Sequence, residues 1–176
     1  MNLERSIAGL FRLDSENWLR HANPWSVYTR TAVYPLLALA IWSRVWIGWW
    51  ALVPTAAALL WMWLNPRLFP APRSTKGWSS RAVFGERVLM NRNNVPVPKH
   101  HVRMSRLLNS LNAVSSAPFI YGLIALEPVY TIGGIFLTMA FKFWYLDRMV
   151  WLFEDMRDER SEYADWVYDK NEEAKP

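Results

Sequence analysis

Long apolar runs alternate with strongly charged segments along this chain, and the boundaries between them are sharp. From Thr31 to Leu64, 34 residues carry a single charge, Arg44. Leu107 to Leu126 carries none over 20 residues, and a further apolar run extends from Val129 to Phe141. A helix that crosses a bilayer needs roughly 20 predominantly apolar residues. The pattern therefore predicts membrane-spanning helices joined by polar segments.

The first apolar run is too long for one span and predicts a tight hairpin. Ser43, Arg44 and Gly48 mark its turn, where tryptophans cluster as expected at a membrane interface. Asn23 and Pro24 suit the N-cap and the first position of a helix, so they predict where the first span begins.

Two further turns complete the expected pattern. Asn65-Pro66 is expected to stop the return helix of the first hairpin, and Glu127-Pro128 to form the turn of a second hairpin. Beyond Phe141 the helical spacing of apolar residues continues into a charged tail, so we expect one long helix to run to about Asp169.

We therefore expect an all-α fold: a four-span transmembrane helical bundle of two hairpins, in a single membrane domain over residues 1–176. Its parts are an interfacial helix (1–22), a first hairpin (26–64), a cytoplasmic basic loop (65–106), a second hairpin (107–150) and an acidic tail (151–176) that forms a C-terminal amphipathic helical extension. One short helix is expected in the loop, near Ser79 to Met90. The interfacial helix either lies among the lipid headgroups or packs on the loop.

Charge distribution predicts the orientation. The basic loop holds nine Lys and Arg against one acid, Glu86, whereas the two hairpin turns carry almost no basic charge. Basic residues accumulate on the cytoplasmic side of membrane proteins. We expect a multi-pass protein of the inner (plasma) membrane with both termini in the cytoplasm, inserted without a cleaved signal peptide.

Composition narrows the range of functions. The chain is 52% apolar, has 12 tryptophans and contains no cysteine, which excludes disulfides and thiolate metal sites. A net charge of +5 could suggest nucleic acid, but the basic residues flank hydrophobic spans, so we expect no nucleic-acid partner. The expected partners are the bilayer and anionic lipid headgroups.

The candidate chemistry lies in histidines and acids expected at the cytoplasmic face. Imidazole and carboxylate groups together suit Zn or Fe. The spacing matches no compact metal motif, and paired surface histidines without a metal are the alternative. No other cofactor is predicted, and catalytic residues stay unassigned. The candidate metal ligands are His100, His101, Asp147, Glu154 and Asp158.

Several short motifs resemble those of an uncharacterised prokaryotic integral-membrane protein family, a domain of unknown function. The likeness covers about residues 15–158 and implies no activity. The motifs that carry it are Arg20–Arg30, Ile41–Arg44, Trp63–Phe69, Gly85–Arg87, Val95–Pro98 and Leu146–Trp151.

Two functional hypotheses follow. The first is a non-enzymatic membrane component, either self-associating as a homo-oligomer or acting as an accessory subunit of a larger membrane complex. Small residues in the third and fourth spans, which favour close helix packing, support it. The alternative is a membrane-embedded, metal-dependent enzyme that acts on a lipid or hydrophobic substrate at the cytoplasmic face.

Overall fold

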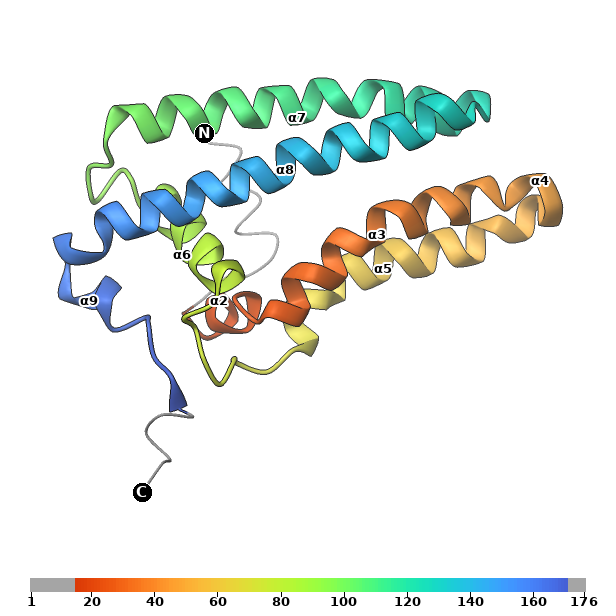
Figure 1. Ribbon diagram of the computed structural model, residues 1–176. Coiled ribbons are helices and arrows are strands. Elements are labelled where there is room, and N and C mark those ends of the chain that lie inside the picture. The colour runs from red at the N-terminus through yellow and green to blue at the C-terminus, as the bar shows by residue number, and fades with distance from the viewer. Residues whose placement is uncertain (1–14, 171–176) are drawn as a thin grey trace.

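The computed structural model describes residues 15–170, and this part of the chain is helical, without strands. Figure 1 shows two long helical hairpins that lie side by side, with shorter helices gathered at one end of the molecule. The turns of both hairpins lie at the opposite end. The expectation of an all-α fold is confirmed.

The first hairpin begins as its sequence predicts. After α2 (Ser15–His21), α3 (Pro24–Trp42) is capped by Asn23, whose Oδ1 accepts a hydrogen bond from Trp25 N at 2.9 Å. A short helix α4 (Arg44–Ile47) and a 3₁₀ turn η1 (Gly48–Ala51) then reverse the chain. Gly48 has φ 55°, a value that glycine adopts without steric cost.

The return helix α5 (Leu52–Leu68) does not stop at Asn65-Pro66 as expected. Asn65 is fully buried; its Oδ1 accepts from Ser26 Oγ and its Nδ2 donates to Thr29 Oγ1, both at 2.7 Å. These bonds hold the last turn of α5 against α3. The helix continues four residues beyond Leu64, its predicted last residue.

The basic loop is more helical than its prolines suggested. It contains α6 (Trp78–Met90), as expected, and its last residues already belong to α7, which begins at Lys99. The described part of the N-terminal helix, α2, buries Trp18 against this region instead of exposing it. For these residues the structure favours packing on the loop; residues 1–14 lie outside the described part.

The second hairpin consists of α7 (Lys99–Ala125) and α8 (Pro128–Met156), joined at Leu126 and Glu127. The two helices approach closely because glycines face backbone across the contact. A Cβ at Gly134 would lie 2.5 Å from Phe119 Cα, and one at Gly122 would overlap the backbone of Thr131. Small residues at this contact agree with the predicted close packing.

The helix expected to continue to Asp169 ends at Met156. It is followed by η2 (Arg157–Glu159), α9 (Ser161–Ala164) and an extended segment. Tyr163 is buried, and the ring of Trp166 stacks 6.4 Å from that of Phe153. A straight helix would carry these aromatic rings away from the core, so the chain turns back to bury them.

The C-terminal segment also ties down the loop between α5 and α6. Thr75 N donates to Tyr168 O at 3.0 Å, and Ser74 forms a β-bridge with Asp169. The acidic tail and the basic loop are therefore in contact, through backbone as well as side-chain groups.

The main hydrophobic core lies at the end that holds α2, α6 and α9, where Phe84, Met149 and Phe153 are buried. Toward the hairpin turns the long helices expose large apolar side chains instead. Three helical segments of the described chain are long and apolar enough to cross a membrane: Pro24–Leu68, Lys99–Ala125 and Pro128–Glu159. Only 17% of the most apolar stretch of the first is buried, and 28% in each of the others.

Candidate functional site

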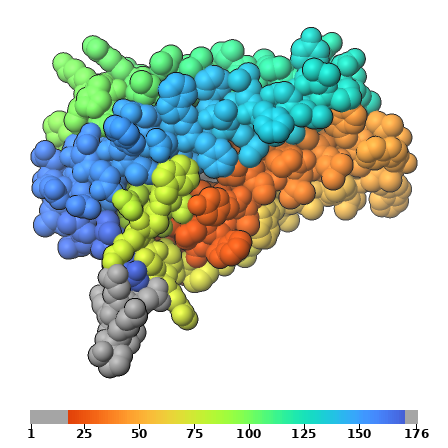
Figure 2. All heavy atoms as spheres, in the orientation of Figure 1, coloured from red at the N-terminus to blue at the C-terminus, as the bar shows by residue number. Residues whose placement is uncertain are grey.

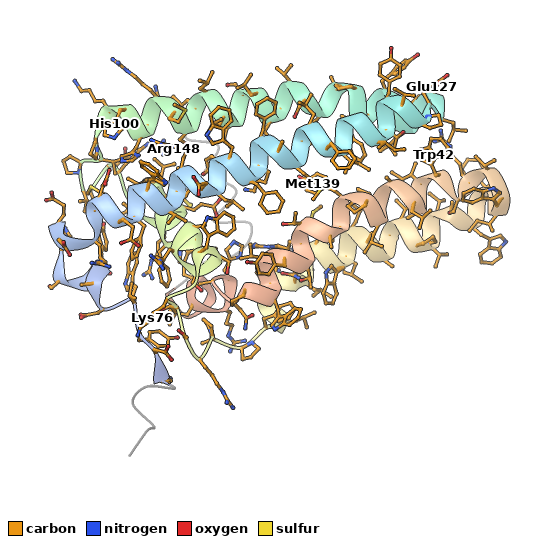
Figure 3. All side chains as sticks on the ribbon, in the orientation of Figure 1. Trp42, Lys76, His100, Glu127, Met139 and Arg148 are labelled. Atoms are coloured by element: carbon orange, nitrogen blue, oxygen red, sulfur yellow. The ribbon has the colours of Figure 1, made fainter. Side chains whose placement is uncertain are left out.

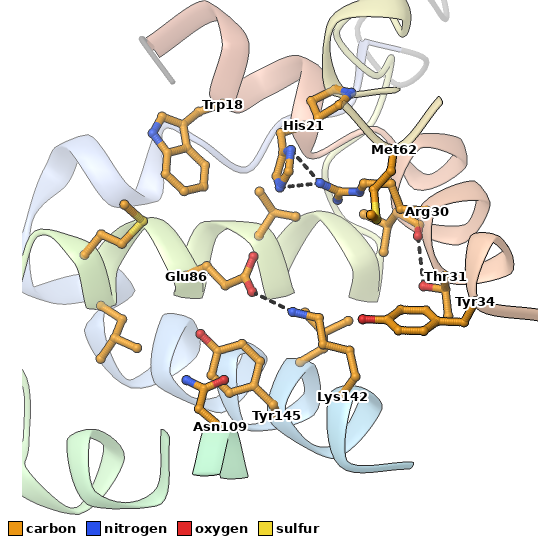
Figure 4. Close-up of a pocket in the computed structure, with 16 residues that line it drawn as sticks. Trp18, His21, Arg30, Thr31, Tyr34, Met62, Glu86, Asn109, Lys142 and Tyr145 are labelled. Carbon is orange, nitrogen blue, oxygen red and sulfur yellow. Dashed lines mark hydrogen bonds and ion pairs between the residues drawn. The ribbon is translucent and has the colours of Figure 1, made fainter. Parts of the chain in front are cut away.

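A cavity of 410 Å³ lies where the first hairpin meets α6 and the second hairpin. Figure 4 shows charged and aromatic side chains turned into it from helices far apart in the sequence. Ligand pockets in proteins have volumes of roughly 300–1,000 Å³. The cavity is therefore large enough for a small ligand or for the end of a longer one.

The charged groups of the cavity come from three elements. Arg30 lies in the second turn of α3, Glu86 in the middle of α6, and Lys142 halfway along α8. Lys142 Nζ lies 3.4 Å from Glu86 Oε1 and 4.9 Å from the centre of the Tyr145 ring. These contacts join α6 to α8.

Arg30 faces His21 across the cavity wall. Its Nη1 lies 2.7 Å from both ring nitrogens of His21. Burial lowers the pKa of His21 well below its ordinary value near 6.5, and the charges of Arg30 and Lys142 lower it further. A guanidinium group only donates hydrogen bonds, so the neutral imidazole accepts one from Arg30.

The charges that line the cavity do not balance. Within the described chain its lining has two basic side chains besides His21, Arg30 and Lys142, and one carboxylate, Glu86, while the lowered pKa of His21 favours its neutral form. One positive charge is left without a counter-charge on the cavity wall. Ionisable groups beside apolar spans are costly and are commonly functional.

The rest of the lining is mostly apolar or aromatic. It includes Tyr34, Met62, Leu89 and Leu146, and Trp18 closes the side toward α2. A cavity that combines the basic groups of Arg30 and Lys142 with apolar walls suits a molecule that carries both an anionic group and a hydrocarbon part.

A second cluster lies at the far end of α7, away from this cavity. His100 and His101 in its first turn meet Asp155 in the last turn of α8, and one potential ligand atom from each lies within 4.8 Å of the other two. Figure 3 shows His100 at this end of α7, with Glu127 and Trp42 at the opposite end of the molecule. The two histidines expected to bind metal are thus adjacent to a carboxylate, though one outside the predicted set.

The other predicted ligands lie apart from this cluster. Asp147 accepts a hydrogen bond from Trp78 Nε1 at 3.2 Å. Glu154 pairs with Arg81 at 2.9 Å and with Arg157, and Asp158 lies 3.6 Å from Arg157 Nε. They serve here as acceptors for neighbouring side chains, and their role as ligands stays a prediction.

The sequence contained weak signals for the cavity. Glu86 is the single acid of a basic loop, and Lys142 is the first charge after the apolar start of the fourth span. Neither signal reveals that the two side chains meet, because 56 residues separate them.

The described part of the chain is helical, and three of its helical segments have the length and composition of membrane-spanning helices, which are features of a helical membrane protein. The model of a family of unknown function, DUF6653, matches residues 2–169, so the chain belongs to that family. No curated protein and no solved structure matches it.

Proposed function

We propose that this protein is a four-span integral membrane component that binds an amphipathic molecule through its anionic group. The observation that carries the proposal is the cavity with one uncompensated positive charge between two apolar hairpins. The protein acts in this proposal as a binding component, not as a catalyst.

The four spans of the proposal are α3, α5, α7 and α8. Support comes from the exposed apolar side chains along these helices, which water would solvate poorly. The basic residues of α6 and of the start of α7 lie at the end opposite the hairpin turns (Figure 1). By the positive-inside rule this end faces the cytoplasm, with both termini, across the inner (plasma) membrane.

The ligand class follows from the lining of the cavity. A monoanionic group such as a carboxylate or a phosphate diester would compensate the excess positive charge of Arg30 and Lys142, and both side chains donate charge-assisted hydrogen bonds. An alkyl chain would extend along Tyr34, Met62 and Leu146. A purely polar anion would leave this apolar part of the wall in contact with water.

Binding of a dansyl-labelled undecanoic acid to protein in phosphatidylcholine nanodiscs tests the proposal. We expect saturable fluorescence enhancement with the wild type, and an affinity at least about tenfold lower for Arg30→Gln, since losing a charge-assisted contact costs about 1.4 kcal/mol or more. The probe with an amide in place of its carboxylate should bind at least about tenfold more weakly for the same reason. The Lys142 side chain is 40% exposed, so Lys142→Met should lower the affinity by a smaller factor.

Arg106→Gln is the matched control, because Arg106 is exposed on α7 and does not line the cavity. It should bind the probe as the wild type does. Equal affinity of the wild type for the acid and the amide would contradict the proposal, as would unchanged binding by both cavity variants. Thermal unfolding of each variant separates lost binding from lost folding.

A further inference from the structure

We infer that His100, His101 and Asp155 form a binding site for a divalent cation of the Zn²⁺ class. The site lies where the first turn of α7 meets the last turn of α8, separate from the cavity proposed to bind an amphiphile. It retains the two predicted histidines and replaces the predicted acids with Asp155.

The distances between the groups suit one metal ion. His101 Nε2 lies 2.7 Å from Asp155 Oδ2, and the ring centres of His100 and His101 are 4.1 Å apart. Tetrahedral Zn²⁺ with bonds of about 2.0–2.1 Å holds its ligand atoms about 3.4 Å from each other. This separation lies between the 2.7 Å of the existing contact and the 4.8 Å limit of the cluster. His100 and Asp155 are both exposed, so their side chains have room to rotate toward a bound ion.

The hydrogen bonding of His101 supplies independent support. The side chain is 2% exposed, and its Nδ1 is buried without a hydrogen-bond partner in the described part of the chain. With the proton on Nε2, shared with Asp155, Nδ1 presents a buried lone pair that no donor satisfies. Buried polar atoms are almost always paired, so an orphaned imidazole nitrogen beside a second imidazole calls for a ligand.

Asp155 can take part in the metal site in two ways, depending on which ring nitrogen of His101 binds the ion. It coordinates the ion directly, or it accepts the Nε2 proton and orients the ring while Nδ1 coordinates, which is a common arrangement at protein metal sites. Both arrangements need the same three side chains. Two imidazoles and one carboxylate favour Zn²⁺ over Mg²⁺ or Ca²⁺, which prefer oxygen ligands alone. Water completes the coordination.

The test uses the full chain, purified in mild detergent with an affinity tag that lacks histidine and stripped with a chelator that is then removed. Equilibrium dialysis against Zn²⁺, followed by elemental analysis, measures bound metal, and the visible spectrum of bound Co²⁺ reports tetrahedral coordination. We expect one equivalent of Zn²⁺, a rise in Tm of about 5–10 °C at saturating metal, and no response to Mg²⁺.

His100→Ala and Asp155→Asn should each lower the Zn²⁺ affinity by at least about tenfold. Both positions are exposed, so the variants should fold. Asp155→Asn keeps a side chain of the same size and an acceptor oxygen beside His101 Nε2, and thermal unfolding checks that the fold is retained. The matched controls are Asp158→Asn, three residues along the chain, and His21→Ala, which removes the histidine of the other cavity. Both controls should bind Zn²⁺ within twofold of the wild type.

A wild type that takes up no stoichiometric Zn²⁺ would overturn the inference and leave only a hydrogen bond between His101 and Asp155. Zn²⁺ binding that is unchanged in both His100→Ala and Asp155→Asn would overturn the inference too. So would a loss of Zn²⁺ binding in the His21→Ala control as large as the loss in the site variants. None of these outcomes affects the amphiphile proposal, since that test measures a fluorescent carboxylate in protein free of added metal.

Discussion

At the scale of single residues, Asn65 has the clearest structural role. Its amide group bridges Ser26 and Thr29, so that the end of α5 is held to the start of α3. Asn65→Ala removes both hydrogen bonds and leaves the Ser26 hydroxyl, which is fully buried, without an acceptor. We expect a loss of about 2–3 kcal/mol in the free energy of unfolding, measured by denaturant titration in detergent micelles.

Asn94→Ala is the comparison for this prediction. Asn94 is exposed and bonds only locally, to Asn91 at 2.8 Å. Its replacement should change the free energy of unfolding by no more than about 0.5 kcal/mol. Equal effects of the two substitutions would show that the amide bridge between α3 and α5 contributes little.

His21 should make the stability of the fold depend on pH. Its pKa is lowered in the folded state, so below pH 6.5 the unfolded chain binds a proton that the folded chain does not. The contribution of neutral His21 to stability is complete above pH 6.5, the pKa of His21 in the unfolded chain. It is lost as the pH falls below that value. Between pH 7.5 and 5.5 the wild type should lose about 1 kcal/mol more than His21→Gln, measured by unfolding at both pH values. Parallel loss in the two proteins would contradict the lowered pKa.

Residue types pointed to part of the candidate chemistry and missed the rest. The paired histidines were recognisable because imidazoles are uncommon and were expected at one face. Asp155 could not be chosen over Asp147 or Glu154 from spacing alone, because the choice depends on how α8 is rotated against α7. The cavity was missed for a related reason: Arg30, Glu86 and Lys142 meet only after three separate helices have packed.

At the scale of elements, the contact between α6 and α8 depends on the absence of a side chain. A Cβ at Gly85 would overlap the carbonyl oxygen of Met149, a backbone atom that cannot move without shifting α8. Gly85→Ala should therefore reduce the free energy of unfolding by about 1–3 kcal/mol, as expected for overpacking. Thermal unfolding in detergent is the measurement.

Gly133→Ala offers a matched test on α8 itself. A Cβ at Gly133 would have no neighbour within 4 Å, and alanine favours a helix interior over glycine by about 0.5–1 kcal/mol. This substitution should leave stability unchanged or raise it slightly. Destabilisation of similar size in both variants would argue against the close contact at Gly85.

Sequence patterns predicted some helix boundaries and missed others: α6 ends at Met90 as expected, whereas α7 begins at Lys99 and not near Leu107. Local signals set two of the beginnings: Asn23 caps α3, which starts at Pro24, and Glu127 is the N-cap of α8, which starts at Pro128. The ends of α5 and α8 depend instead on distant partners. Asn65 bonds to α3 and the aromatic tail packs on Phe153, and no local propensity reveals either contact.

At the scale of the whole molecule, the proposed topology can be tested directly because the chain contains no cysteine. Asn93→Cys places a thiol beside α6, and Trp49→Cys, at a side chain that is 87% exposed, places one in the first hairpin turn. If both termini are cytoplasmic, a membrane-impermeant maleimide should label Trp49→Cys in intact cells. It should label Asn93→Cys only in inverted vesicles. The reverse pattern would contradict the orientation.

The segregation of charge made the overall class of fold predictable. Apolar runs of sufficient length predicted helices that could span a membrane, and the structure has three helical segments with that property. The arrangement of the hairpins was not predictable, because it depends on contacts such as Trp42 Nε1 to Thr131 Oγ1 at 3.2 Å, which join residues 89 positions apart.

The two hairpins are in contact near their turns and are connected at the opposite end by α2 and α6. Near the turns, Arg44 donates to the carbonyl oxygens of Leu123 and Ile124 at 2.7 Å, and side chains of the hairpins meet on the face seen in Figure 2. At the other end, α2 and α6 join them. Because the hairpins are in contact at both ends, the amphiphile of the proposal would enter between these contacts, from the side that faces the bilayer. Pro35 lies next to the cavity residue Tyr34 and lacks the amide hydrogen that would bond to the preceding turn of α3. If α3 bends to admit the ligand, we expect the bend at this position.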